Sequence, residues 1–201
     1  MTQIAIHPAT ETTDTTTAST SSSTIPATDR AFIPGYTGLR CRACGTAAAD
    51  GPVFVCTRCF GPLEPAYDLD GIRARLTRET IDARRPDVWR WAELLPVPEL
   101  PTTGVTVGES PLTEAPRLAA RIGLAKLWVK DDSRNPSLSF KDRPVSIAAA
   151  RAKAWGYHTL ACASTGNLSA AVAAAAAAHG LRAVVFIPAD LEPAKIAQAR
   201  A

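Results

Sequence analysis

The sequence predicts an α/β protein in which helices cover a parallel sheet and a small zinc-ribbon-like module precedes the sheet. Two observations carry this prediction. From residue 127 onwards, short apolar segments alternate with longer helical ones, which is the order that produces a parallel sheet. Before this region, four of the five cysteines form two Cys-x-x-Cys pairs, a spacing typical of structural zinc sites.

Length and composition restrict the class of protein. The 201 residues are 46% hydrophobic and 20% charged, which lies in the globular range. A net charge of +3 without a dense basic block argues against a nucleic-acid partner. No run approaches the roughly 18 apolar residues of a membrane span, and the N-terminus lacks the basic and apolar regions of a signal peptide. We therefore expect a cytoplasmic protein without a membrane partner.

Changes in composition divide the chain into three parts. Residues 1–31 are rich in Thr and Ser with little that is large and apolar, so we expect a disordered tail. Residues 32–67 contain short apolar pieces between turn residues, too few to form a core alone, and make up the zinc-ribbon-like module. Residues 68–201 form the larger domain, which begins with a helical periodicity over 68–95 and a proline-rich linker over 96–101.

The rest of the larger domain alternates between strand and helix patterns. Gly156 and Gly180 follow two of the helices, as glycine commonly does at a helix C-terminus. About three strands are predicted, whereas a sheet of this kind commonly holds five or six, so we expect a sheet that is incomplete at the C-terminus. The predicted strands are 127–129, 159–163 and 183–187, and the predicted helices are 145–155, 168–179 and one that begins near Pro193.

The cysteine pairs are the strongest local motif. Cys41 and Cys44 are separated by eleven residues from Cys56 and Cys59, and a glycine follows each pair closely. Two such turns can place four thiolates around a tetrahedral zinc ion, which would stabilise a segment with so little core. The alternative is a pair of reduced thiol clusters that hold no metal. Because the four cysteines would fill every ligand position, we expect a structural role for the zinc.

Lys141 lies in a polar segment, 135–143, between a strand and the start of a helix. The positive end of the helix dipole and the neighbouring Arg143 both favour a neutral amine, the form that attacks a carbonyl. From its position alone, an exposed lysine of the first helical turn remains the simpler interpretation. Pro144 limits how early the helix can begin and moves its expected start toward Lys141.

The segment Ser164, Thr165, Gly166 and Asn167 follows a predicted strand and precedes an alanine-rich helix. Such a loop presents backbone amides and short hydroxyls at a helix N-terminus, which suits a carboxylate or phosphate group. A plain helix cap with a glycine turn explains the same residues equally well.

Taken together, these motifs resemble the threonine synthases of the fold-type II pyridoxal-phosphate family. The resemblance runs from about residue 39 to the C-terminus and includes the two cysteine pairs. The runs that carry it are SFKDR at 139–143, ASTGN at 163–167, GESPL at 108–112, LWVK at 127–130, CFGPLE at 59–64, and WRW at 89–91 with LLP at 94–96.

This resemblance implies a set of roles. Lys141 would be the catalytic residue, binding pyridoxal 5'-phosphate through its amine and later moving protons on the substrate. Asn167 would hydrogen-bond the 3-hydroxyl of the cofactor, and Ser164 and Thr165 would hold the substrate carboxylate. Phe140 and Asp142 would position the lysine. The implied reaction converts O-phospho-L-homoserine and water to L-threonine and phosphate, and we expect the full-length protein to be a homodimer.

The same resemblance makes the chain look like an N-terminal fragment. The family's phosphate-binding loop and the residue that faces the pyridine nitrogen belong to a later part of such enzymes, so we expect these 201 residues alone to bind cofactor weakly and to be inactive. Two other functions stay open. One is a different fold-type II dehydratase or β-replacing synthase, and the other is a non-catalytic zinc-ribbon binding module.

Overall fold

The structure is a computed structural model that describes residues 2–5 and 35–200. Most of the tail predicted over 1–31 lies outside these residues. The exception is β1 (Thr2–Ala5), which pairs antiparallel with β8 (Arg182–Ile187). Nothing in the residue pattern of the tail indicated this strand.

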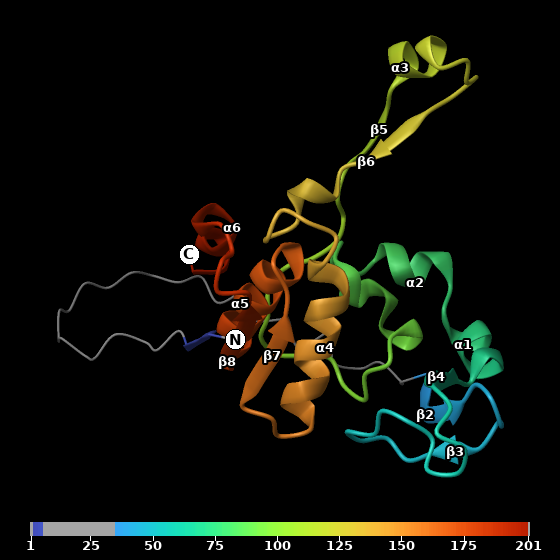
Figure 1. Cartoon of the computed structure of the whole chain (residues 1–201). Helices are drawn as coiled ribbons and strands as arrows, with labels where there is room; N and C mark the ends of the chain where they lie inside the picture. The colour runs from blue at the N-terminus through green and yellow to red at the C-terminus, as the bar shows by residue number, and fades with distance from the viewer. Residues whose placement is uncertain (1, 6–34, 201) are drawn as a thin grey trace, which may run out of the picture.

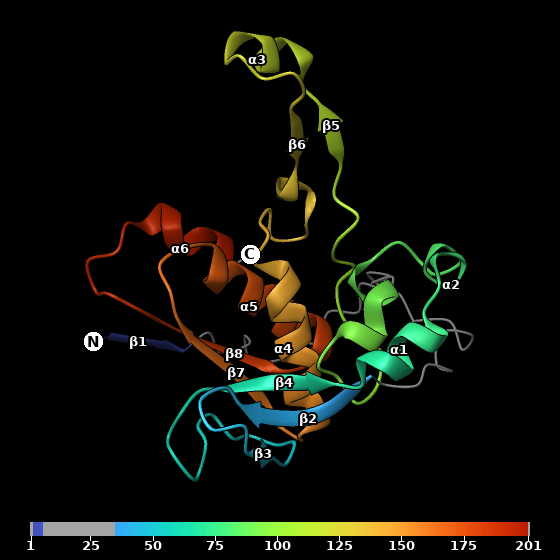
Figure 2. The same ribbon diagram turned by 90° about the vertical axis from the view of Figure 1, so that its right-hand side faces the viewer.

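The cysteine-containing segment forms a small antiparallel sheet with strand order β3-β2-β4. Figure 2 shows the three strands side by side. Cys41 ends the central strand, and the chain then turns back so that the Gly45 amide donates to the Cys41 carbonyl at 2.9 Å. The strands are β2 (Tyr36–Cys41), β3 (Ala47–Ala48) and β4 (Leu63–Tyr67).

The helical periodicity predicted over 68–95 is divided among three short helices. Each begins at a capping side chain, Asp68, Thr77 or Asp87, that accepts a hydrogen bond from a backbone amide two or three residues later. A polar side chain that satisfies free amides starts a new helix, and this explains the division. The helices are α1 (Leu69–Arg75), α2 (Arg78–Asp82) and the 3-10 helix η2 (Val88–Leu94).

An arm made of β5 (Leu112–Glu114), α3 (Pro116–Arg121) and β6 (Trp128–Lys130) extends away from the rest of the molecule in Figures 1 and 2. The prediction that the strand near 127–129 joins the parallel sheet is therefore wrong. β6 pairs antiparallel with β5 instead. All three residues of β6 are exposed, whereas a strand inside a parallel sheet is covered on both faces.

The remaining elements form the expected α/β unit. β7 (Thr159–Ala163) and β8 pair in parallel, which confirms the predicted pairing, and β1 lies on the other side of β8. Among the described residues, no helix is both long enough and apolar enough to span a bilayer. The other elements of this region are η3 (Asp132–Arg134), α4 (Asp142–Ala154), α5 (Asn167–His179) and α6 (Pro193–Arg200).

Helix α4 lies at the centre of the core. One side of it packs Val145 and Ala149 against α5 and β7, and Figure 1 shows α4 and α5 side by side. Another side packs Ala150 against Trp89 and Val97 of the preceding segment. Because α4 is buried between two groups of elements, its first residue is held in a defined position.

Candidate active site and metal centre

Lys141 is the residue directly before α4 and has helical backbone angles. Helix α4 thus begins close to Lys141, as expected, and Pro144 lies in its first turn, where a proline is tolerated. The backbone amide of Lys141 donates to Ser139 Oγ at 3.3 Å, and the half-buried side chain places Nζ 5.0 Å from the centre of the Phe140 ring. Among the described residues, no hydrogen bond or ion pair engages Nζ. The amine is therefore available to a ligand.

The loop before Lys141 is held from the first turn of α4. Asp142 is 2% exposed, and its Oδ2 accepts a hydrogen bond of 2.8 Å from the Ser137 amide. Leu138, which follows Ser137 in the loop, has a φ of +59, in the left-handed region that favours glycine. Such backbone strain persists only where surrounding contacts hold it, and it is common at functional sites.

The second loop places its polar side chains at the start of α5. Asn167 is the first residue of the helix, and both Asn167 and Thr165 are exposed. Ser164 is half-buried at the end of β7, where its amide donates to the Phe186 carbonyl of β8 and its Oγ accepts from the Gly166 amide at 3.3 Å. The predicted position of these residues, after a strand and at a helix start, is confirmed.

The fold brings the two loops to the same edge of the sheet. Helix α4 leads into β7 and α5 leads out of it, so both helices run opposite to the strand and begin at its carboxyl end. Val145 and Ala171 each lie four residues after Lys141 and Asn167, respectively, and belong to the same buried cluster. The first turns of both helices therefore contribute to one buried cluster.

Arg143 anchors this edge to the loops that precede it, a role that the sequence did not reveal. Its guanidinium donates to Asp132 Oδ1 at 2.8 Å and to Ser110 Oγ at 2.9 Å, and Ser110 donates to Asp132 at 2.5 Å. Hydrogen bonds from Arg143 and Ser110 hold the pKa of Asp132 below its ordinary value. Because Ser110 lies 33 residues before Arg143 in the chain, only the fold shows that they meet.

The same anchor depends on Gly108. This residue has φ +100, and a Cβ there would come 3.1 Å from the Val88 amide nitrogen and 3.4 Å from the Arg143 guanidinium. Its own amide donates to Asn135 Oδ1 at 3.1 Å. A glycine is required here because both the backbone angle and the close approach exclude a larger residue.

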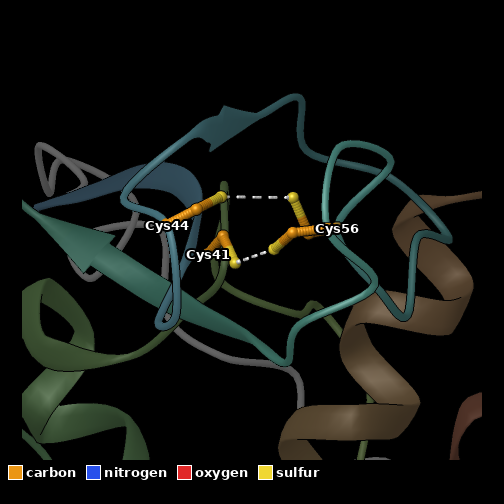
Figure 3. A group of neighbouring side chains, drawn as sticks. Cys41, Cys44 and Cys56 are labelled. Carbon is orange, nitrogen blue, oxygen red and sulfur yellow. Dashed lines mark hydrogen bonds between the residues drawn. The ribbon is translucent and has the colours of Figure 1, made fainter.

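The four paired cysteines meet in one cluster, and Figure 3 shows the sulfurs of Cys41, Cys44 and Cys56 turned toward one another. All four sulfurs lie within 4.8 Å of each other, with Cys41 to Cys59 at 3.5 Å and Cys44 to Cys56 at 3.7 Å. Four thiolates around a tetrahedral zinc ion are about 3.8 Å apart. The geometry therefore fits zinc.

Backbone groups close around the sulfurs in the way a metal site requires. A Cβ on Gly61 would lie 3.0 Å from Cys41 Sγ and 3.2 Å from Cys59 Sγ, and the Arg58 amide donates to Cys56 Sγ at 3.4 Å. Cys41 and Cys56 are 1% and 2% exposed. Amide hydrogen bonds to sulfur stabilise thiolate ligands, so this surrounding suits a bound cation.

The thiols of the cluster differ in acidity. Hydrogen bonds with Thr46 lower the pKa of Cys44 to about 6. A hydrogen bond from the Gly61 amide favours the thiolate of Cys59, but hydrogen bonds with Cys44 and Cys41 outweigh it and raise the pKa of Cys59 to about 12. The surroundings of Cys44 thus favour its thiolate, the form in which cysteine binds metal.

Comparison with known proteins shows which families this chain is similar to. Residues 105–201 match the family described as "Pyridoxal-phosphate dependent enzyme". The chain is 40% identical over 163 residues to the threonine synthase of Methanosarcina acetivorans, a match that covers 80% of this chain and 40% of that protein. It is 37% identical over 151 residues to the threonine synthase of Methanocaldococcus jannaschii, which covers 74% of this chain and 37% of that protein.

A third relative, the threonine synthase of Synechocystis, is 48% identical over 96 residues, or 47% of this chain and 25% of that protein. The chain thus spans about two fifths of the length of the first two relatives. The resemblance indicated by the sequence motifs is confirmed: residues 105–201 match the family of pyridoxal-phosphate dependent enzymes, and the chain is similar to threonine synthases.

Proposed function

We propose that this chain provides the lysine-bearing part of a threonine synthase, with Lys141 as the catalytic residue. The observation that carries the proposal is the half-buried Lys141 amine, which is free of hydrogen bonds among the described residues and stands at the same sheet edge as Asn167. The reaction would convert O-phospho-L-homoserine and water to L-threonine and phosphate. The relatives named threonine synthase support this choice of reaction.

The residues at the sheet edge fit pyridoxal 5'-phosphate. Lys141 Nζ would bind the aldehyde of the cofactor and, when released, carry protons to and from the substrate carbons. Asn167 would donate to the 3-hydroxyl, and Ser164 and Thr165, with the amides at the start of α5, would bind the substrate carboxylate. When bound, the cofactor withdraws electrons from the substrate carbon that bears the amine.

The residues around Lys141 would orient the amine. Asp142 fixes the preceding loop through Ser137, and Phe140 covers one side of the amine with its ring. Arg143 ties the first turn of α4 to Asp132 and Ser110. Each of these contacts limits the positions that Nζ can take, which lowers the entropy cost of reaching a reactive geometry.

The four cysteines would hold one structural zinc ion. Their thiolates would occupy all four positions of the ion, so that a substrate has no place to bind it. The metal would instead stabilise the sheet of β2, β3 and β4, which buries little apolar surface beyond Cys41 and Cys56.

Borohydride trapping tests the catalytic assignment directly. The whole chain is incubated with pyridoxal 5'-phosphate, reduced, digested and mapped by mass spectrometry, and we expect the pyridoxyl label on Lys141. Lys195→Ala, which removes an exposed amine paired with Glu192, is the matched control and should leave the label in place. A label spread evenly over surface lysines, or one that persists on other residues in Lys141→Ala at equal yield, would overturn the proposal.

A further inference from the structure

One arginine near the end of α4 joins this helix to the loop between the two cysteine pairs. Arg151 is held on one side by Asp50, whose Oδ1 lies 2.5 Å from its guanidinium. The guanidinium also stacks over the rings of Tyr36 at 5.0 Å and Trp155 at 4.4 Å and donates to the Pro96 carbonyl. Tyr36 in turn donates to Asp50 at 2.8 Å. We call these four side chains, Arg151, Asp50, Tyr36 and Trp155, the arginine clamp.

The arginine side of the clamp is shielded from solvent, and its aspartate side is partly open. The side chain of Arg151 is 12% exposed and that of Asp50 is 30% exposed. Removal of one partner of an ion pair that is partly removed from water costs more than breaking a surface pair, because the other charge is left without its partner. The clamp therefore has the strength to hold two parts of the structure together.

The Asp50 side of the clamp lies on a loop that the cysteines control. Cys44 and Cys56 stand at its two ends and face each other at 3.7 Å. Between them the loop buries little of its own, since Val53, Phe54 and Val55 are all exposed, Phe54 by 83%. Before Asp50, the pairing of β3 with β2 holds the loop. From Asp50 to Cys56 the loop has few buried contacts, so its order there depends on the clamp and on Cys56.

The Arg151 side of the clamp lies on the helix that begins at Lys141. Arg151 lies nine positions after Asp142, about 14 Å along the helix at 1.5 Å per residue. The helix is rigid over this length because Val145, Ala149 and Ala150 are buried between them. A change in how Arg151 is held is thus carried along α4 as a rigid element.

We propose that the arginine clamp couples the metal centre to helix α4. Zinc bound to Cys44 and Cys56 holds the 44–56 loop so that Asp50 contacts Arg151. This contact in turn fixes α4, the helix that follows Lys141 directly. The inference rests on the proposed zinc site and assigns it a second effect. Coupling of this kind is reciprocal, so the clamp must also strengthen zinc binding.

Zinc affinity measures the coupling without any need for catalysis. The whole chain, with and without Arg151→Met, is titrated with zinc in competition with a chromophoric chelator. We expect the dissociation constant to rise by roughly 5- to 150-fold in the variant, the range typical of coupled sites. Arg73→Met is the matched control, because Arg73 pairs with Asp70 at an exposed position on α1. It should leave the dissociation constant unchanged.

Each outcome has a distinct meaning. A wild-type chain that binds no zinc overturns the metal assignment and the coupling with it. A chain that binds zinc with equal affinity in wild type, Arg151→Met and Arg73→Met keeps the metal site and overturns the coupling. If Arg151→Met does not fold, Asp50→Asn decides the question, because it removes the charge on the loop and leaves α4 intact.

Hydrogen exchange gives a second readout on the helix itself. In the wild-type chain, removal of zinc should speed amide exchange in the last two turns of α4, around Arg151. In Asp50→Asn the exchange of this segment should already be fast and should respond little to zinc. Equal zinc dependence of α4 exchange in both proteins would contradict the proposal.

Discussion

The amide of Ser137 donates a 2.8 Å hydrogen bond to the buried carboxylate of Asp142, so that the loop before Lys141 is tied to the helix after it. This contact closes a short ring of residues around the lysine. Because Asp142 also lies in the first turn of α4, its charge interacts favourably with the helix dipole.

Loss of the Asp142 carboxylate should destabilise the chain. In Asp142→Ala the Ser137 amide is left without its partner inside the protein, which costs about 1–3 kcal/mol. We expect a lower urea midpoint by far-UV circular dichroism and slower pyridoxyl labelling of Lys141 at equal cofactor concentration. Asp190→Ala, at an exposed position after β8, serves as the control. Equal midpoints for the two variants would show that the Ser137 contact contributes nothing.

Removal of metal should weaken the module that contains β2, β3 and β4. A ligand present at a hundred times its dissociation constant stabilises the folded state by about 2.7 kcal/mol, so excess chelator should lower the melting temperature. Cys56→Ser should lose the ion, as measured by elemental analysis of the purified chain. Cys162→Ser, on β7 and outside the cluster, should keep one zinc per chain. A chelator-treated chain with an unchanged melting curve would argue against zinc.

His179 should make stability depend on pH. It is buried at the end of α5, with Nδ1 3.4 Å from Thr103 Oγ1, and Lys153 donates to its carbonyl. Burial, and then the charge of Lys153, lower the pKa of His179. The folded state thus favours the neutral ring. This contribution is complete above the unfolded pKa of about 6.5 and is lost as the pH falls through the lower folded value.

His179→Gln tests this dependence, since glutamine has no charge to gain. Between about pH 7.5 and 5.5 the wild-type free energy of unfolding should fall more steeply than that of the variant. Comparison of the two proteins cancels the contribution of the cysteine thiols, which they share. Parallel curves would mean that His179 titrates alike in the folded and unfolded states.

The contact between α4 and α5 should tolerate only small side chains. Ala149 and Ala171 are both fully buried in the cluster that joins the helices. A larger side chain forces the helices apart or into strained rotamers, at about 1–3 kcal/mol. Ala171→Leu should therefore lower the urea midpoint, whereas Ala177→Leu, at an exposed position of the same helix, should change it little. An unchanged midpoint for Ala171→Leu would show that the interface can expand.

The local pattern of the chain was enough to locate most of the candidate site. The Cys-x-x-Cys spacing locates the two cysteine pairs. The change from β-prone segments to alanine-rich ones predicts the starts of α4 and α5 to within a few residues of where the structure has them. Each of these signals lies within one short stretch of the chain, so hydrophobic periodicity, turn glycines and caps are sufficient to identify it.

The arm was misassigned for a related reason. An apolar run such as that of β6 is compatible with either a parallel or an antiparallel neighbour, and the partner is chosen by the chain connection. Here β5 is near in sequence and pairs with β6 in antiparallel orientation. Periodicity alone carries no information about that choice.

By itself, then, the sequence determined where the reactive lysine, the hydroxyl loop and the cysteine pairs stand along the chain. Only the tertiary structure decided that Arg143 meets Ser110 and that Arg151 meets Asp50, 101 residues earlier. The physical reason is that contacts between distant residues depend on how whole elements pack. A single polar side chain belongs to no periodic pattern, so the sequence does not indicate which residue it will contact.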